Sequence, residues 1–142
     1  MSVPRRTRVA LGWFALTCWA VGVLRLSALT PQELPQTGFP LSDKIAHIVV
    51  YAVGGWLAAT TLRITRRRVG VADWLLPAVL LVAGFGILDE AFQTFTPGRT
   101  GGDLFDWFAD VVGAATGAGL SLWAHRRSGS RRTGPVRPPP DR

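Results

Sequence analysis

Cysteine is almost absent from this chain, which has a single one, Cys18, among 142 residues. An internal disulfide is therefore excluded, and so is a zinc site built on paired cysteines. The sequence also contains no HExxH helix, no glycine-rich phosphate loop and no nucleophile elbow. The metalloproteases, nucleotide-binding proteins and hydrolases that depend on these motifs are accordingly poor descriptions of it.

Acidic residues are also scarce, because nine Asp and Glu stand against 16 Lys and Arg, a formal net charge of +7. In a soluble protein such a charge would favour a nucleic-acid partner. Here the arginines flank long apolar runs instead. We therefore expect no nucleic-acid partner and a membrane environment.

Hydrophobic residues make up 48% of the chain. They concentrate in four runs, at residues 9–26, 45–64, 74–92 and 107–124. Each run approaches the ~20 apolar residues that a transmembrane helix needs. The sequence therefore predicts an all-α, integral membrane four-helix bundle over residues 1–125. We predict a disordered tail for residues 126–142, which are basic, rich in Pro, Gly and Ser, and without apolar periodicity.

The distribution of the basic residues predicts the orientation of the bundle. Most of them precede the first run, separate the second from the third, or follow the fourth: Arg5, Arg6, Arg8, Arg63, Arg66, Arg67, Arg68, Arg126, Arg127, Arg131, Arg132, Arg137 and Arg142. Positive residues concentrate in cytoplasmic loops, so both termini should be cytoplasmic. No convincing cleavage site precedes Pro31, and we expect the first run to remain as an uncleaved helix.

Small residues and tryptophans recur at positions that predict how the helices pack and where they meet the membrane surface. Small residues recur at every fourth position of the last run, at Ala109, Gly113, Gly117 and Ser121. This spacing predicts close helix contact, within the bundle rather than in a dimer. Tryptophans at the ends of the runs, Trp74, Trp107 and Trp123, are expected to anchor the membrane interface.

Polar residues gather at the outer ends of the last three runs, where they form the candidate site: Asp43, Lys44, His47, Tyr51, Asp89, Glu90, Gln93, Arg99, Asp103, Asp106 and Asp110. Helical spacing places Lys44, His47 and Tyr51 on one face. A carboxylate within a span costs roughly 2.5–3.5 kcal/mol, so a cluster of them favours a functional site. Asp43 and Asp103 could instead be helix caps, and Tyr51 a core residue.

Three of these residues, His47, Glu90 and Asp110, are each expected about one turn inside the membrane and are the candidate catalytic groups. The other eight are candidate binding residues, with Arg99 suited to a carboxylate or a phosphate. Crowded carboxylates favour either proton transfer or a divalent cation as cofactor, and the sequence does not separate these options. A structural histidine paired with Asp110 or Glu90 is the alternative for His47.

Three sequence motifs carry a family resemblance: DKIAHIVVY, DEAFQTFTPGR and DLFDWFADVVGAATG. Together they resemble the VanZ-like family of small bacterial membrane proteins, over residues 43–119. The resemblance implies that the eleven polar residues above are signature positions and that the protein lies in the bacterial cytoplasmic membrane. The family's founding member is associated with low-level resistance to the glycopeptide teicoplanin.

The function expected from these observations is binding, with processing as an extension, of the anionic head of a membrane lipid or lipid-linked envelope precursor. Whether the protein is an enzyme stays open. The alternative is a non-catalytic structural or partner-binding membrane module. An ion path ranks last, because the inner halves of the runs lack ionisable groups.

Overall fold

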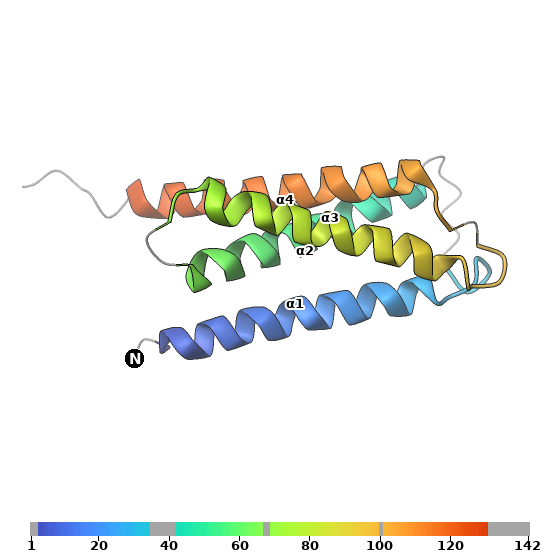
Figure 1. Cartoon of the computed structure of the whole chain (residues 1–142), viewed down its shortest axis with the longest axis horizontal. Helices are drawn as coiled ribbons and strands as arrows, with labels where there is room; N and C mark the ends of the chain where they lie inside the picture. Colours follow the sequence, from blue (N-terminus) through green and yellow to red (C-terminus); the bar gives the residue numbers. More distant parts are fainter. Residues whose placement is uncertain (1–2, 35–41, 67–68, 100, 131–142) are drawn as a thin grey trace, which may run out of the picture.

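The computed structural model describes residues 3–34, 42–66, 69–99 and 101–130. Within these ranges the chain forms four helices, α1 (Arg5–Ser27), α2 (Ser42–Thr65), α3 (Ala72–Gln93) and α4 (Leu104–Ser130). Consecutive helices run antiparallel, so the N-terminus and the end of α4 lie together, opposite the α3–α4 turn (Figure 1). The predicted all-α architecture is confirmed. The loop expected over residues 30–40 lies partly outside the described residues.

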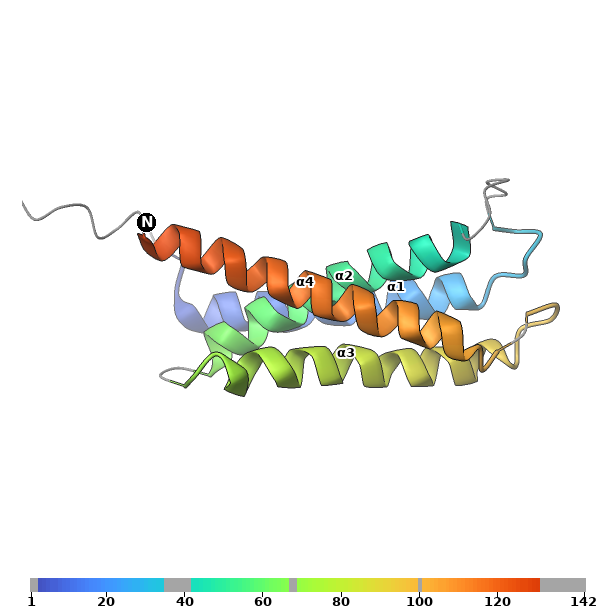
Figure 2. The same ribbon diagram turned by 90° about the horizontal axis from the view of Figure 1, so that it is seen from above.

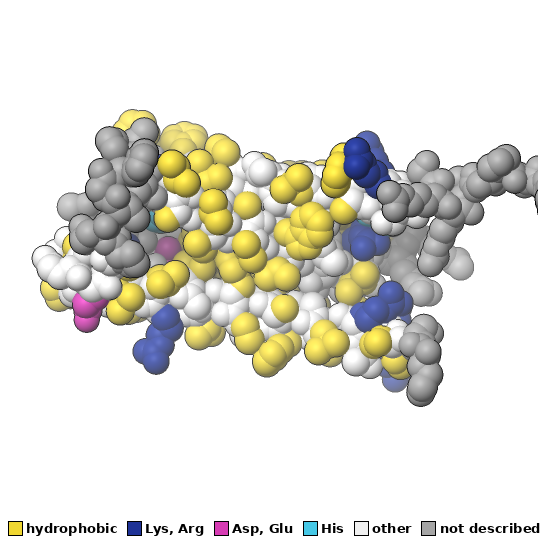
Figure 3. Space-filling view, turned by 180° about the vertical axis from the view of Figure 1, so that it is seen from behind, with side chains coloured by type: hydrophobic (Ala, Val, Ile, Leu, Met, Phe, Trp, Pro, Cys, Tyr) yellow, Lys and Arg dark blue, Asp and Glu magenta, His cyan; other side chains and the backbone are white. Residues whose placement is uncertain are grey.

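Three helices, α1, α2 and α3, are long and apolar enough to cross a membrane. A helix of 22 residues, the length of α3, spans about 33 Å at 1.5 Å per residue, enough for a hydrocarbon core of about 30 Å. Large apolar side chains are exposed along these helices, including Phe14 at 67% and Leu80 at 61%. Figure 3 shows them covering the middle of the molecule, with most basic side chains at the end that carries the termini. This is the surface of a membrane protein.

The closest helix packing joins α2 and α4, which cross in Figure 2. A Cβ atom added at Gly117 would overlap the backbone carbonyl oxygen of Ala52, and one at Gly55 would overlap that of Ala114. The hydroxyls of Thr60 and Ser121 lie 2.9 Å apart in the same interface. The small-residue stripe therefore packs within the bundle, as predicted.

At the end of the molecule that holds the N-terminus, arginine side chains donate to backbone carbonyl oxygens that lack a partner within their helix. The guanidinium of Arg5 donates to the carbonyl oxygens of Ile64 and Thr65 at 3.1 and 2.7 Å and so caps α2. Pro77 has no N–H, and the carbonyl oxygen of Asp73, one turn earlier in α3, accepts from Arg66 at 2.6 Å instead. These contacts satisfy carbonyls that the helices cannot satisfy themselves.

The structure differs from the expected start of the tail. Helix α4 continues through Arg126 and Arg127 to Ser130, into the segment predicted to be disordered. Arginine is a good helix former, and the guanidinium of Arg127 stacks 4.0 Å from the ring centroid of Trp123 one turn earlier. Residues 131–142 of the predicted tail lie outside the described residues.

The three tryptophans expected as membrane anchors have different surroundings. Trp74 is only 4% exposed and belongs to the core. Trp107 is half-buried and its indole N–H donates to the carbonyl oxygen of Ala83 on α3 at 3.1 Å. Trp123 is 52% exposed. The anchor interpretation was wrong for Trp74, because hydropathy gives the depth of a ring but not the direction it faces. For Trp107 and Trp123 it stays a prediction.

Candidate functional site

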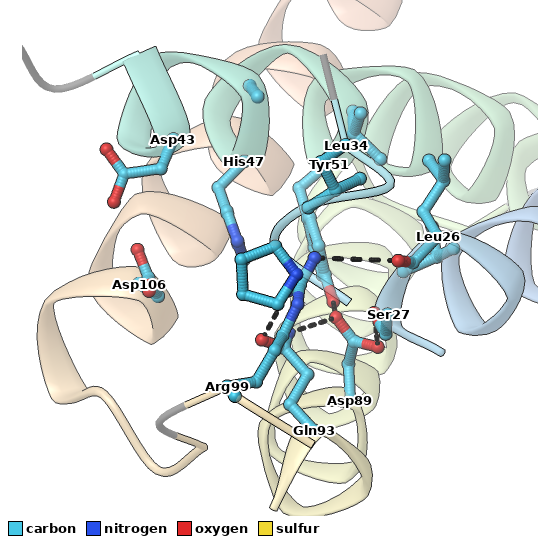
Figure 4. A pocket seen from close by; sticks show the side chains of 15 residues that line it. Leu26, Ser27, Leu34, Asp43, His47, Tyr51, Asp89, Gln93, Arg99 and Asp106 are labelled. Carbon is cyan, nitrogen blue, oxygen red and sulfur yellow. Dashed lines mark hydrogen bonds between the residues drawn. The ribbon is translucent and has the colours of Figure 1, made fainter. Parts of the chain in front are cut away.

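A cavity of about 410 Å³ lies at the end of the molecule where α1 and α3 finish and α2 begins. Its apolar wall comes from α1, the following segment and α2, and includes Val23, Leu26, Leu34 and Val50. Its polar lining consists of Ser27, Asp43, His47, Tyr51, Asp89, Gln93, Arg99 and Asp106. Figure 4 shows Ser27, His47, Tyr51, Asp89, Gln93 and Arg99 close together, with Asp43 and Asp106 to one side.

Asp89 is 1% exposed and sits at the junction of three helices. Its carboxylate accepts from the hydroxyl of Ser27 on α1 at 2.5 Å and from that of Tyr51 on α2 at 3.2 Å. The side-chain amide of Gln93, on the same helix α3, donates to it at 3.3 Å. Both carboxylate oxygens are thereby satisfied, which is what a buried charge requires. Asp89 fastens α1 and α2 to α3.

Arg99 is turned toward α1 and not toward a carboxylate. Its guanidinium donates to the side-chain oxygen of Gln93 at 2.7 Å and to the backbone oxygens of Leu29 and Leu26 at 3.3 and 3.5 Å. The sequence left open whether Arg99 pairs with carboxylates of the site or receives an anionic group, and no pairing with a carboxylate is found among the described residues. Leu26 lies in the last turn of α1 and Leu29 two residues beyond the helix, where carbonyl oxygens lack the full set of helical partners and can accept from Arg99.

Glu90 is gripped by the backbone of the α3–α4 turn. One carboxylate oxygen accepts from the N–H groups of Gly102 and Asp103, at 3.1 and 3.0 Å. Gly102 has a positive φ of 79°, which glycine adopts without strain, and a Cβ atom at Gly101 would collide with the backbone of Thr94 and Glu90. The glycine pair thus lets the turn close over the carboxylate, at the positive N-terminal end of α4.

Lys44 joins α2 to the start of α4. Its ammonium group pairs with Asp103 at 3.0 Å, with Asp43 at 3.4 Å and closely with Asp106. Asp103 also caps α4 by accepting from the backbone N–H of Phe105 at 2.8 Å. The hydrogen bond from Lys44, reinforced by that N–H, holds the pKa of Asp103 below its usual value.

Of the two residues that could be helix caps, the structure confirms one. Asp103 is a cap of α4, whereas Asp43 lies within the first turn of α2, which begins at Ser42. The side chain of Asp43 is 63% exposed and pairs with Lys44. Helical spacing would let Asp43 reach His47 one turn later in α2, but that contact is not among those of the described residues.

His47, Glu90 and Asp110 form the innermost group of the site. A ring nitrogen of His47 (Nδ1) lies 2.8 Å from a carboxylate oxygen of Asp110, which is fully buried. One nitrogen or oxygen atom of each of the three residues lies within 4.8 Å of the others. The ring of Tyr51 stacks alongside His47, with centroids 6.1 Å apart. The structure brings these three residues together at the depth that helical spacing indicated.

Access differs among the three candidate catalytic residues. His47 lines the cavity, whereas Glu90 and Asp110 are not among its lining residues and lie behind it. Tyr51 is both a core residue, at 1% exposure, and a lining residue. A ligand in the cavity could therefore contact His47 directly, whereas Asp110 would act on it only through its hydrogen bond with His47.

Sequence reasoning missed the contribution of α1 to the site. Ser27 donates to Asp89, and its own carbonyl oxygen accepts from the hydroxyl of Thr96 at 2.9 Å. Val23 and Leu26 supply part of the apolar wall. The available signal was Ser27 itself, a small polar residue that ends an apolar run at the depth of the carboxylates.

Comparison with known proteins gives one match. The VanZ/LLP1 family model matches residues 9–125, which include all four helices' apolar parts and every polar residue of the site. No curated protein and no solved structure matches the chain.

Proposed function

This chain belongs to the VanZ/LLP1 family, and from that premise we propose that it is a multi-pass protein of the bacterial cytoplasmic membrane that binds an anionic lipid headgroup. The ligand would be a membrane lipid or a lipid-linked envelope precursor. Both termini would lie in the cytoplasm and the cavity at the outer surface. In this setting the protein would influence the susceptibility of the envelope to glycopeptide antibiotics.

The observation that carries this proposal is that apolar and polar side chains line the same cavity. The apolar lining includes Val23, Leu26 and Val50, and the polar lining includes His47, Gln93 and Arg99. Ligand sites typically combine an apolar lining with a few convergent polar groups. A lipid matches this pattern, since its chain fits the apolar lining and its head the polar lining.

The cations of the site are suited to a phosphate to different degrees. Lys44 is engaged by three carboxylates, at Asp43, Asp103 and Asp106. The three contacts of Arg99 in the described structure use three of the five N–H donors of a guanidinium. Arg99 therefore retains donors for a phosphate oxygen, and His47 offers a further nitrogen at the cavity surface.

Processing of the bound headgroup is an extension of this proposal. His47 lines the cavity and contacts Asp110 behind it, an arrangement that supports proton relay. Glu90 or Asp110 would then act as acid or base, and Arg99 would hold the phosphate.

A second candidate function, a non-catalytic structural or partner-binding module, is favoured by a different observation. Asp89, with its donors Ser27, Tyr51 and Gln93, holds three helices together without any ligand. In that case the polar cluster would serve the assembly of the bundle. The two functions differ for a substitution that blocks the cavity but leaves the hydrogen bonds of Asp89 intact. Such a substitution should weaken lipid binding if the protein binds lipid, and should have no effect if the module is structural.

The test is lipid binding to the purified full-length protein in nanodiscs or by native mass spectrometry. Phosphatidylglycerol and a polyprenyl phosphate would be compared with phosphatidylcholine. Ala46, exposed on the first turns of α2, lines the cavity, so Ala46→Trp should fill it without disturbing the core. The matched control is Ala91→Trp, an exposed alanine of α3 that does not line the cavity.

We expect preferential binding of the anionic lipids, weakened about tenfold or more by Ala46→Trp, which a blocked pocket costing ~1.4 kcal/mol or more would produce. Ala91→Trp should bind as the wild type does. Equal binding of anionic and zwitterionic lipids, or no effect of Ala46→Trp, would overturn the proposal in favour of the structural module.

A further inference from the structure

The innermost group of the site has a feature that hydrogen bonding within the protein does not explain. His47, Glu90 and Asp110, hereafter the three-residue cluster, offer three metal-ligating side chains from three helices. We propose that the three-residue cluster binds one divalent cation, and that the ion is of the class that accepts both imidazole and carboxylate ligands.

The spacing of the ligating atoms supports this proposal. One atom from each residue lies within 4.8 Å of the other two. Two ligands on one tetrahedral ion, with bonds of about 2.1 Å, lie about 3.4 Å apart. The ligating atoms would therefore approach one another by up to about 1.4 Å, which rotation of side chains provides. The three residues come from α2, α3 and α4, so the ion would join three helices.

An independent observation is the unsatisfied oxygen of Asp110. Its side chain is 0% exposed, and among the described residues its Oδ2 atom has no hydrogen-bond partner. Leaving a buried charged oxygen without a partner is costly. Asp89, on the neighbouring helix, shows the usual solution, since both of its oxygens accept hydrogen bonds. A bound cation would supply a partner for the Oδ2 atom of Asp110.

The packing around that oxygen brings Asp110 close to α3. Oδ2 of Asp110 faces Gly86, one turn before Glu90 on α3, and a Cβ atom at Gly86 would lie only 2.7 Å from it. A larger residue at this position would press on the oxygen, so glycine allows Asp110 to approach the helix that carries Glu90.

The mixture of ligands selects the kind of cation. Ca²⁺ and Mg²⁺ prefer sites built entirely of oxygen. An imidazole with two carboxylates suits a first-row transition metal such as Mn²⁺ or Zn²⁺ better. The nitrogen of His47 that faces Asp110 is Nδ1, which lies 2.8 Å from Oδ1. Nδ1 would therefore be the ligating nitrogen, and the other ring nitrogen would not contact the metal.

A bound cation would also explain how an acid-rich site accepts an anion. His47 lines the cavity, so the ion behind it would offset the charge of Glu90 and Asp110 and attract a phosphate. This last step rests on the proposed function. The metal site itself does not, because it follows from the three side chains alone.

The first experiment measures metal binding to the full-length protein, purified in detergent through a tag that lacks histidine and stripped with EDTA. Mn²⁺ and Zn²⁺ would be titrated by calorimetry and counted by elemental analysis, with electron paramagnetic resonance for Mn²⁺. We expect one equivalent bound with either metal. Saturation well below one equivalent with both would overturn the proposal, and this readout needs no substitution.

Variants then locate the site. Asp110→Asn, Glu90→Gln and His47→Ala should each weaken binding at least about tenfold, the lower end of what disturbing a metal site costs. The matched controls are Asp73→Asn, an exposed acid at the other end of α3, and His125→Ala on α4. Unchanged affinity in the three cluster variants, or loss only in His125→Ala, would place the metal elsewhere and contradict the proposal.

Lipid binding with and without EDTA separates the two proposals. Lipid binding that persists unchanged in protein without bound metal would support the proposed function and refute the role of the ion in it. Metal binding with no lipid preference would support the three-residue cluster as a metal site and refute the proposed function.

Discussion

Ser27, the last residue of α1, donates a hydrogen bond of 2.5 Å to the carboxylate of Asp89 near the end of α3. Both residues are buried, at 4% and 1% exposure. Helix α1 contains no Asp or Glu, and this contact joins it to the polar site, whose carboxylates come from α2, α3, α4 and the α3–α4 turn. Because it is buried and charge-assisted, it should contribute more to stability than an ordinary hydrogen bond.

Removing this hydroxyl should destabilise the bundle. We expect Ser27→Ala to lower the free energy of unfolding by about 1.5–3 kcal/mol, the range for hydrogen bonds to charged groups. Unfolding of the purified protein in a denaturing detergent series measures this. Ser128→Ala is the matched control, since its hydroxyl donates only to the carbonyl oxygen of Ala124 on its own exposed helix turn. Equal effects of the two substitutions would contradict a special role for the contact with Asp89.

The glycines of α4 offer a matched pair for the contact between α2 and α4. Gly117→Ala would place a methyl group on the carbonyl oxygen of Ala52, and overpacking of this kind typically costs 1–3 kcal/mol or more. A Cβ atom at Gly119, on the same helix, meets nothing within 4 Å. Gly119→Ala should therefore be neutral or stabilise by up to ~1 kcal/mol through helix propensity. The same unfolding assay checks both, and tolerance of Gly117→Ala would show that the helices do not pack this closely.

The ion pair of Asp103 and Lys44 predicts a pH dependence. The hydrogen bond from Lys44 lowers the pKa of Asp103 in the folded protein from its ordinary value of 3.8. Its contribution to stability is then present above that value and is lost as the pH falls through the lower, folded pKa. Asp103→Asn keeps a side-chain cap for α4 but loses the charge. The variant should be less stable than the wild type at pH 7, and the difference should shrink below about pH 4.

Thermal denaturation of both proteins from pH 7 to pH 3, in one detergent, measures the prediction for Asp103. A difference in stability that stays constant over the whole range would mean that the charge of Asp103 contributes nothing.

The orientation in the membrane predicts a labelling pattern. In a Cys18→Ala background, Pro97→Cys in the exposed α3–α4 turn should react with a membrane-impermeant thiol reagent in intact cells. Val69→Cys, 43% exposed between α2 and α3, should react only after the cells are opened. The positive-inside rule is the reason, because arginines flank Val69 and the termini. The reverse pattern would place the cavity on the cytoplasmic side.

The sequence alone was sufficient to predict the four helices and the end of the bundle at which the polar residues gather. The four apolar runs correspond to α1 through α4, and each helix extends beyond its run into the flanking residues. Spacing along each helix also placed His47, Glu90 and Asp110 at one depth. Depth and helical face are local properties, fixed by a rise of about 1.5 Å and a turn of about 100° per residue.

Only the tertiary structure decided which partner each polar group has. Asp89 and Asp110 look alike in the sequence, yet Asp89 is fully hydrogen-bonded and Asp110 keeps an unsatisfied oxygen. Arg99, which the sequence left free to pair with a carboxylate or to receive an anionic group, donates instead to carbonyl oxygens at and just beyond the end of α1. These choices depend on how each helix is rotated against its neighbours, and that rotation follows from close packing between residues distant in the sequence, such as Gly117 against Ala52.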